Sequence, residues 1–257
     1  MLYPVALLIM CLPLRPAKDG AAKPLELTKP PAPASITGKA CFAGNVEEFQ
    51  PVPIPAFPED TACYAFCREQ HRREPILRED VVLNAKTNPV TIRNVLVYLK
   101  VAPRVETSPP PDAVVVEMQR CVFRPHVLGV RAGQTLRFIN ADDDGLNVHF
   151  YSAANEEANF SLPRRGQQLE FQLKPEPPFR VRSDIHPWTS LWVAVFDHPF
   201  FAVTGNDGAF RIENLPPGKY VLEAWHEKFG TLQAQVEVAA GETKAVDFTF
   251  APKPREP

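Results

Sequence analysis

The chain has 257 residues, enough for one large domain or two small ones, and a formal net charge of −2. A charge so close to zero argues against polyanion binding, so we expect no nucleic-acid partner. The 29 prolines gather in the first third of the chain and near residues 103–111 and 175–187, which is typical of turns and extended loops rather than long helices.

The N-terminus has the pattern of a secretory signal. Residues 1–14 are apolar and are followed by Arg15, Pro16 and Ala17. We expect a signal peptide over residues 1–17 and a linker over residues 18–34, with export to the periplasm, the cell envelope or the medium. A lipoprotein signal at Cys11 and a buried N-terminal strand are the alternatives. Beyond the signal no run of 18 apolar residues occurs, so we expect no integral membrane span.

The cysteines predict disulfide bonds. Four of them remain after removal of the signal, and an even number in an exported protein favours pairing. We favour a bridge from Cys121 to either Cys63 or Cys67, with Cys41 as a further candidate. A zinc or haem site at Cys63, Cys67 and His71 fits less well, because zinc sites of this kind need a second ligand pair.

Strand signals begin before residue 113. Residues 35–42, 81–83 and 92–101 have the alternation or β-branched content of strands, and residues 62–73 fit a short helix. In the third of these strands Val97, Leu99 and Val101 would share one face. Residues 35–112 therefore provide strands together with an irregular segment.

From residue 113 onward strand signals recur every 8–12 residues, which predicts an all-β sandwich architecture. The expected strands are residues 114–117, 127–130, 135–139, 147–151, 169–173, 179–182, 191–196, 209–212, 220–226, 232–238 and 245–250.

Two family resemblances divide this region. The first is carried by residues 123–127, 130–135, 138–140 and 147–149 and by the later His186-Pro187-Trp188. Together these segments resemble a cupredoxin over residues 113–198. The resemblance implies a Greek-key β-sandwich.

The second resemblance lies in residues 199–251, before a tail at 252–257. Leu215-Pro216-Pro217-Gly218 and its flanking strands resemble the carboxypeptidase regulatory-like, transthyretin-like β-sandwich. Residues 38–42 and 94–99 fit two earlier strands of that smaller sandwich, which would then be discontinuous. The chain is similar to exported bacterial proteins that join these two modules in this order.

The cupredoxin resemblance places copper ligands at four positions. They are occupied here by Leu146, Ser183, His186 and Thr189. A blue-copper site needs a thiolate, two imidazoles and a weak axial ligand. Only His186 keeps a ligand side chain, so the resemblance implies a degenerate site with no cofactor.

A rewired copper or zinc site is the alternative. The imidazoles of His126, His149 and His186 would suit either metal. His126 could approach His186, whereas we expect His149 to point away from Asn147 and the ligand cavity. His126 and His149 could equally be structural or surface residues. An acidic turn over residues 140–145 resembles a calcium loop but has Tyr151 in place of the closing glutamate, which favours a solvated turn.

We expect no enzyme. The sequence has no phosphate-binding glycine loop, and Ser183, Asp184 and His186 are too close together for a catalytic triad. The expected function is a non-catalytic exported scaffold or binding module for an unknown protein or envelope polymer. One alternative is metal binding or electron transfer at the rewired site. Another is carbohydrate or envelope-polymer binding, with stacking on Trp188, Trp192 and Trp225, although core packing of these rings is expected.

Overall fold

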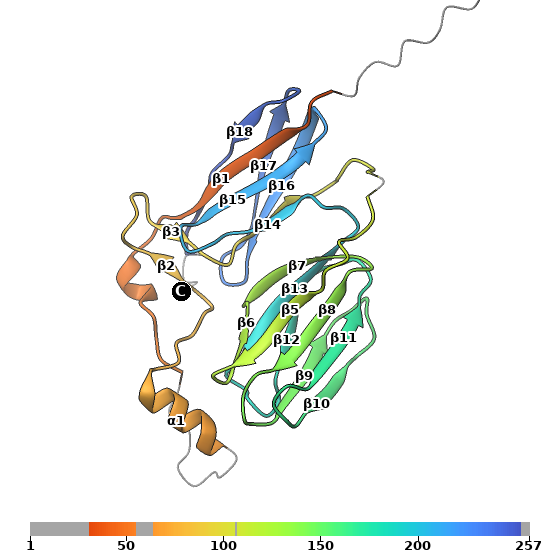
Figure 1. The fold of residues 1–257 in the computed structure, drawn as a ribbon. Helices are drawn as coiled ribbons and strands as arrows, with labels where there is room; N and C mark the ends of the chain where they lie inside the picture. The colour runs from red at the N-terminus through yellow and green to blue at the C-terminus, as the bar shows by residue number, and fades with distance from the viewer. Residues whose placement is uncertain (1–30, 55–63, 106, 253–257) are drawn as a thin grey trace, which may run out of the picture. The chain divides into compact units, whose positions relative to one another are not determined.

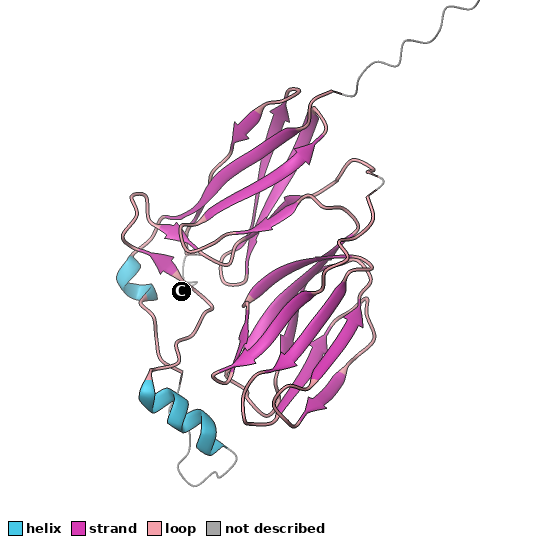
Figure 2. Ribbon diagram, viewed as in Figure 1, coloured by secondary structure: helices cyan, strands magenta, loops and turns pink. Residues whose placement is uncertain are grey.

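The computed structural model describes residues 31–54, 64–105 and 107–252. The predicted signal peptide, Cys63 and most of the predicted linker and tail lie outside the described residues. The described residues all belong to one compact unit of the chain. Strands dominate the structure (Figure 2), so the predicted all-β class is confirmed.

A sandwich of two sheets occupies residues 114–196. One sheet has the order β10-β9-β12-β13-β7 and the other the order β11-β8-β5-β6 (Figure 1). β7 and β13 pair in parallel, as do β5 and β8, so the chain crosses over rather than running as a meander. The strands are β5 (Val114–Gln119), β6 (Val122–Arg124), β7 (Val127–Arg131), β8 (Thr135–Asn140), β9 (Leu146–Tyr151), β10 (Asn159–Leu162), β11 (Gln168–Gln172), β12 (Glu176–Arg182) and β13 (Ser190–Phe196).

The core of this central sandwich lies between its two sheets. Phe138 from one sheet and Phe150 from the other are both buried, with ring centroids 5.9 Å apart. β8 alternates half-buried and buried residues, the period of a strand with one face in a core. Every buried member of this core comes from residues 116–195. Among the described residues, the central sandwich therefore builds its core without strands from outside this range.

The remaining strands come from both sides of the central sandwich in sequence. β1 pairs with β15 on one edge and in parallel with β18 on the other (Figure 1). β19 also pairs with β1 in parallel on the edge that carries β18. β4 lies between β14 and β16 in a second sheet that β17 completes. These strands are β1 (Ala34–Phe42), β2 (Leu83–Asn84), β3 (Thr91–Ile92), β4 (Leu96–Leu99), β14 (Phe201–Val203), β15 (Ala209–Leu215), β16 (Gly218–His226), β17 (Gly230–Val238), β18 (Thr243–Ala245) and β19 (Phe248–Phe250).

The smaller sandwich is therefore discontinuous, as residues 38–42 and 94–99 predict. Its core joins Ile36 and Val97 from the N-terminal strands to Leu222 and Phe250 from the C-terminal ones. Neither half of the sequence contains this core alone.

The predicted strand over residues 92–101 is interrupted. Asn94 has a φ of 64°, in the left-handed region, and separates β3 from β4. Val97 and Leu99 are buried on β4, but β4 ends at Leu99 and Val101 is 76% exposed beyond it. The prediction that Val101 continues this face was wrong.

The described residues between β1 and β2 include two short helices. They are η1 (Val46–Phe49) and α1 (Ala65–Arg73), the second of which falls within the predicted helix. The one buried residue of α1 is Cys67. Among the described residues no helix has the length and apolarity to cross a membrane.

Candidate functional site

All four positions to which the resemblance assigns copper ligands are buried in the central sandwich. Leu146 begins β9, Ser183 follows β12, and His186 and Thr189 lie in the loop that leads to β13. Their exposed fractions are 1%, 0%, 3% and 3%, respectively. We call these four residues the ligand-position cluster.

The polar side chains of this cluster form hydrogen bonds within the protein. The Ser183 hydroxyl donates to Oδ1 of Asn147 at 2.9 Å and accepts from the backbone N–H of His186 at 3.0 Å. Oγ1 of Thr189 accepts from the backbone N–H of Phe123 at 2.9 Å. Leu146 belongs to the apolar core. These residues do not fit a blue-copper ion, because the cluster has no thiolate, no thioether and one imidazole.

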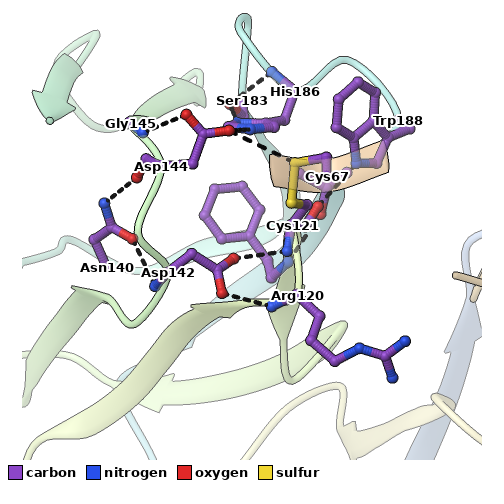
Figure 3. Close-up of a disulfide and its surroundings, with 12 residues drawn as sticks. Cys67, Arg120, Cys121, Asn140, Asp142, Asp144, Gly145, Ser183, His186 and Trp188 are labelled. Atoms are coloured by element: carbon purple, nitrogen blue, oxygen red, sulfur yellow. Dashed lines mark hydrogen bonds and ion pairs between the residues drawn. A yellow bond between two sulfur atoms is a disulfide. The ribbon is translucent and has the colours of Figure 1, made fainter. Parts of the chain in front are cut away.

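A disulfide lies beside the cluster. Cys67 of α1 is bonded to Cys121, in the turn between β5 and β6, with Cα atoms 5.8 Å apart (Figure 3). This bond is one of the two pairings favoured from the sequence. Cys41 was also a disulfide candidate, and that prediction was wrong: Cys41 is a free thiol buried within β1, and burial raises its pKa.

The turn that carries Cys121 has an unusual backbone. Gln119 pairs with Val122, so Arg120 and Cys121 form a two-residue hairpin loop with φ values of 54° and 62°. A loop of this kind normally contains Asn or Gly, which tolerate positive φ. Here the Asp142 carboxylate stabilises it by accepting the N–H of Arg120 at 2.8 Å and of Cys121 at 2.7 Å.

The prediction of a solvated acidic turn was wrong at Asp142. Its side chain is buried, with 6% exposed, because it reaches inward to the hairpin loop, whereas Asp143 is exposed. Burial raises the pKa of Asp142, although the two backbone N–H donors oppose the shift. The turn is thus a structural support for Cys121.

His186 is enclosed by the disulfide, an acidic residue and an aromatic ring. Its Nε2 lies 3.5 Å from Oδ2 of Asp144, and its ring is 5.1 Å from that of Trp188 (Figure 3). Sγ of Cys67 lies 3.7 Å from the same Asp144 oxygen. This contact is not a hydrogen bond, because a disulfide sulfur carries no hydrogen. Burial lowers the pKa of His186 while Asp144 and Asp142 oppose the shift, so the neutral imidazole is favoured.

The structure does not bring His126, His149 and His186 together. The described side chains that place three potential ligand atoms within 4.8 Å of one another are Cys67, Cys121 and His186. His126 instead pairs through Nε2 with the Glu227 carboxylate, which also accepts from Nε1 of Trp192 at 2.9 Å.

His149 was expected to point away from Asn147, and this was wrong. The two residues are two positions apart on β9 and so share one face. Both bind Oδ2 of Asp184, at 2.9 Å from Nδ1 of His149 and at 3.1 Å from Nδ2 of Asn147. His149 also lies 3.2 Å from Glu157. This imidazole therefore belongs to a polar network around Asp184.

The three tryptophans are packed rather than presented as a platform. Nε1 of Trp188 donates to the carbonyl of Cys121 at 2.8 Å. The rings of Trp192 and Trp225 meet edge to face with centroids 5.1 Å apart. All three are half-buried.

A small apolar cluster closes over the disulfide. Ile54, Ile76 and Val122 are buried around Cys67 and Cys121, with three half-buried aromatic residues against them, namely Tyr64, Phe66 and Trp188. We call this group the cap cluster. It packs against the disulfide beside the ligand-position cluster.

Sequence reasoning found His186 and the cysteines but missed the role of Asp144. Its position between two other aspartates suggested a cation loop. Only the folded turn directs Asp144 toward His186 and Cys67 (Figure 3).

One family model matches the C-terminal part of the chain. Residues 193–251 match the family model described as the carboxypeptidase regulatory-like domain. This confirms the predicted domain of that kind. No curated protein matches the chain.

Several solved structures are similar to part of this chain. A purple cupredoxin from Nitrosopumilus maritimus is 20% identical over 33% of this chain and 100% of its own, with a TM-score of 0.28. A mutant of amicyanin is 24% identical over 33% of this chain and 82% of its own, with a TM-score of 0.30. A copper-containing nitrite reductase from Thermus scotoductus SA-01 is 19% identical over 38% of this chain and 25% of its own, with a TM-score of 0.31. The predicted resemblance to cupredoxins is thus found again among known structures.

Proposed function

We propose that the protein is a non-catalytic, exported scaffold or binding module whose central sandwich carries no blue-copper ion. The observation that supports this most directly is the use of the ligand-position cluster for internal packing. Ser183 and Thr189 make buried hydrogen bonds to the protein, and Leu146 is part of the core. A soft metal would find one imidazole there and no free sulfur donor.

The disulfide and the cap cluster support the same proposal. Cys67 and Cys121 are fully buried and paired, so neither presents a thiolate to a metal. Formation of such a bond fits an oxidising compartment, which is consistent with export. The partner would be an envelope protein or polymer bound on a surface of either sandwich.

Titration of the oxidised full-length protein with Cu²⁺ tests this proposal. We expect no intense visible charge-transfer band, and weak uptake that His186→Ala leaves unchanged. Stoichiometric uptake that His186→Ala abolishes would contradict the proposal and favour a metal-binding function. A matched His149→Ala variant tests whether the half-buried imidazole beside Asp184 accounts for weak binding.

A further inference from the structure

Reduction of the disulfide would change the chemistry beside His186. The ligand atoms of Cys67, Cys121 and His186 lie within 4.8 Å of one another. Oδ2 of Asp144 lies 3.5 Å from Nε2 of His186 and 3.7 Å from Sγ of Cys67. Two sulfurs and one imidazole therefore lie close together, with a carboxylate beside the imidazole and the sulfur of Cys67 (Figure 3).

We propose that the reduced protein binds a zinc-class divalent ion through Cys67, Cys121 and His186, with Asp144 as the fourth donor. This donor set suits zinc, which is bound tetrahedrally by thiolate, imidazole and carboxylate. The site goes beyond the proposed function, which concerns the oxidised chain.

The oxidised cysteines cannot form this site, because the thiolate and not the disulfide sulfur is the metal ligand. A dithiol reductant supplies two electrons and two protons. The Cys67–Cys121 bond breaks, two thiols form, and the reductant becomes a disulfide. The ion then replaces the two thiol protons, which pass to solvent, and two metal–sulfur bonds form.

The geometry can accommodate the ion. Metal–sulfur bonds of ~2.3 Å at tetrahedral angles hold two sulfurs ~3.8 Å apart. The Cα atoms of Cys67 and Cys121 are 5.8 Å apart, so side-chain rotation can supply most of that separation. Cys67 is the one buried residue of α1, so a small shift of this helix disturbs no other buried side chain of its own.

The surroundings are those of a closed, structural site. Both cysteines are fully buried and His186 is 3% exposed. The four donors come from α1, the β5–β6 turn, the turn after β8 and the loop before β13. A bound ion would therefore replace the disulfide as the link between α1 and the central sandwich.

Cobalt titration tests the site, because Co²⁺ reports thiolate ligation and tetrahedral geometry by absorption. The full chain is used with Cys11→Ser, Cys63→Ser and Cys41→Ala, so that only Cys67 and Cys121 respond. It is reduced with dithiothreitol, and the reductant is removed without air. We expect one Co²⁺ per reduced chain with thiolate bands, displacement by Zn²⁺, and no such bands before reduction.

Substitution of each proposed ligand tests whether that side chain binds the metal. His186→Ala is expected to weaken Co²⁺ binding at least ~10-fold, and Asp144→Asn by roughly the same factor. The matched control, His149→Ala, is expected to bind normally. A folded, reduced chain that shows no thiolate bands, or equal affinity in His186→Ala, would overturn the inference.

Loss of folding on reduction would not leave the site untested. If circular dichroism shows that reduction unfolds the chain, Zn²⁺ is expected to restore the folded spectrum, since metal binding is then coupled to folding. A chain that stays unfolded with Zn²⁺ would refute the site. Failure of the proposed function would be distinct, because it is read from the oxidised protein, as a copper–thiolate band or as stoichiometric Cu²⁺ uptake that His186→Ala abolishes.

Discussion

Asp142 is the residue on which the local geometry of the disulfide depends. Its carboxylate holds two consecutive N–H groups in a hairpin loop made of residues that disfavour positive φ. Hydrogen bonds to a charged group contribute roughly 1.5–3 kcal/mol each. Cys121 is thus presented to Cys67 by a side chain more than twenty positions further along the sequence.

Replacement of Asp142 by alanine should destabilise the protein by about 2–4 kcal/mol, because two buried N–H groups lose their acceptor. Asp143→Ala is the matched control: its side chain is exposed and pairs only with exposed Arg165, so its effect should stay below about 0.5 kcal/mol. Chemical denaturation of both variants measures the difference. Equal stabilities would show that the carboxylate does not hold the loop.

The buried imidazole of His226 makes the stability of the protein depend on pH. Burial lowers its pKa from 6.5 to about 4, with a smaller contribution from His126 that Glu227 opposes. Between those two values the unfolded chain binds a proton at this residue that the folded chain does not. Stability therefore falls as the pH decreases from 6.5 to about 4, by about 3 kcal/mol in total from this group.

The His226→Gln variant should lose that part of the acid sensitivity. The free energy of unfolding, measured from pH 7 to pH 4, should fall by about 3 kcal/mol less than in the unmodified protein. Curves that run parallel over this range would show that the imidazole titrates normally in the folded state.

At the scale of elements, α1 depends on the disulfide. One buried side chain anchors the helix, and the cap cluster around it is small. A disulfide that closes a loop of 54 residues stabilises by up to about 4 kcal/mol in the chain-entropy model. The central sandwich has its own core and should tolerate loss of this bond.

The double variant Cys67→Ala/Cys121→Ala should release α1 and leave the sandwich folded. Limited trypsin digestion is expected to cut much faster at Arg68, Arg72 and Arg73 than in the unmodified protein, with the β-strand signal of the far-ultraviolet spectrum retained. Cys41→Ala is the control, since that thiol is unpaired. Unaltered protection of α1 would mean that the cap cluster alone holds the helix.

The elements that the sequence predicted best have a clear period of two, as β8 does, or a continuous apolar run, as β13 does. β8 and β13 were located because their apolar residues face a core. β6 was missed because Arg120 and Cys121 are not typical turn residues, and their positive φ values depend on distant Asp142. The choice between Cys63 and Cys67 also depended on how α1 docks, which no local pattern specifies. The surroundings of His186 were unpredictable for the same reason.

At the scale of the whole molecule, the smaller sandwich needs both ends of the described chain. β1 forms the middle of its sheet, between β15 and the pair β18 and β19. Gly38 of β1 permits this close approach, because a Cβ atom there would lie 1.8 Å from the carbonyl oxygen of Val246. The central sandwich is an insertion that separates the strands of this sheet along the sequence but not in space.

Fragments should reflect this organisation. A fragment of residues 199–257 is expected to be unfolded by circular dichroism, because it lacks β1 and β4 and half of its core. A fragment of residues 113–198 with Cys121→Ser should fold cooperatively, since its core is complete. A folded C-terminal fragment would show that the N-terminal strands are dispensable.

We propose that the central sandwich does not hold a blue-copper ion. Electron paramagnetic resonance of the oxidised full-length protein with one equivalent of Cu²⁺, recorded beside amicyanin, tests it most directly. We predict the wide copper hyperfine splitting that oxygen and nitrogen ligands produce. The visible absorption spectrum of the same sample should show no charge-transfer band. A narrow splitting with an intense visible band, as a copper–thiolate bond produces, would show that the central sandwich binds blue copper.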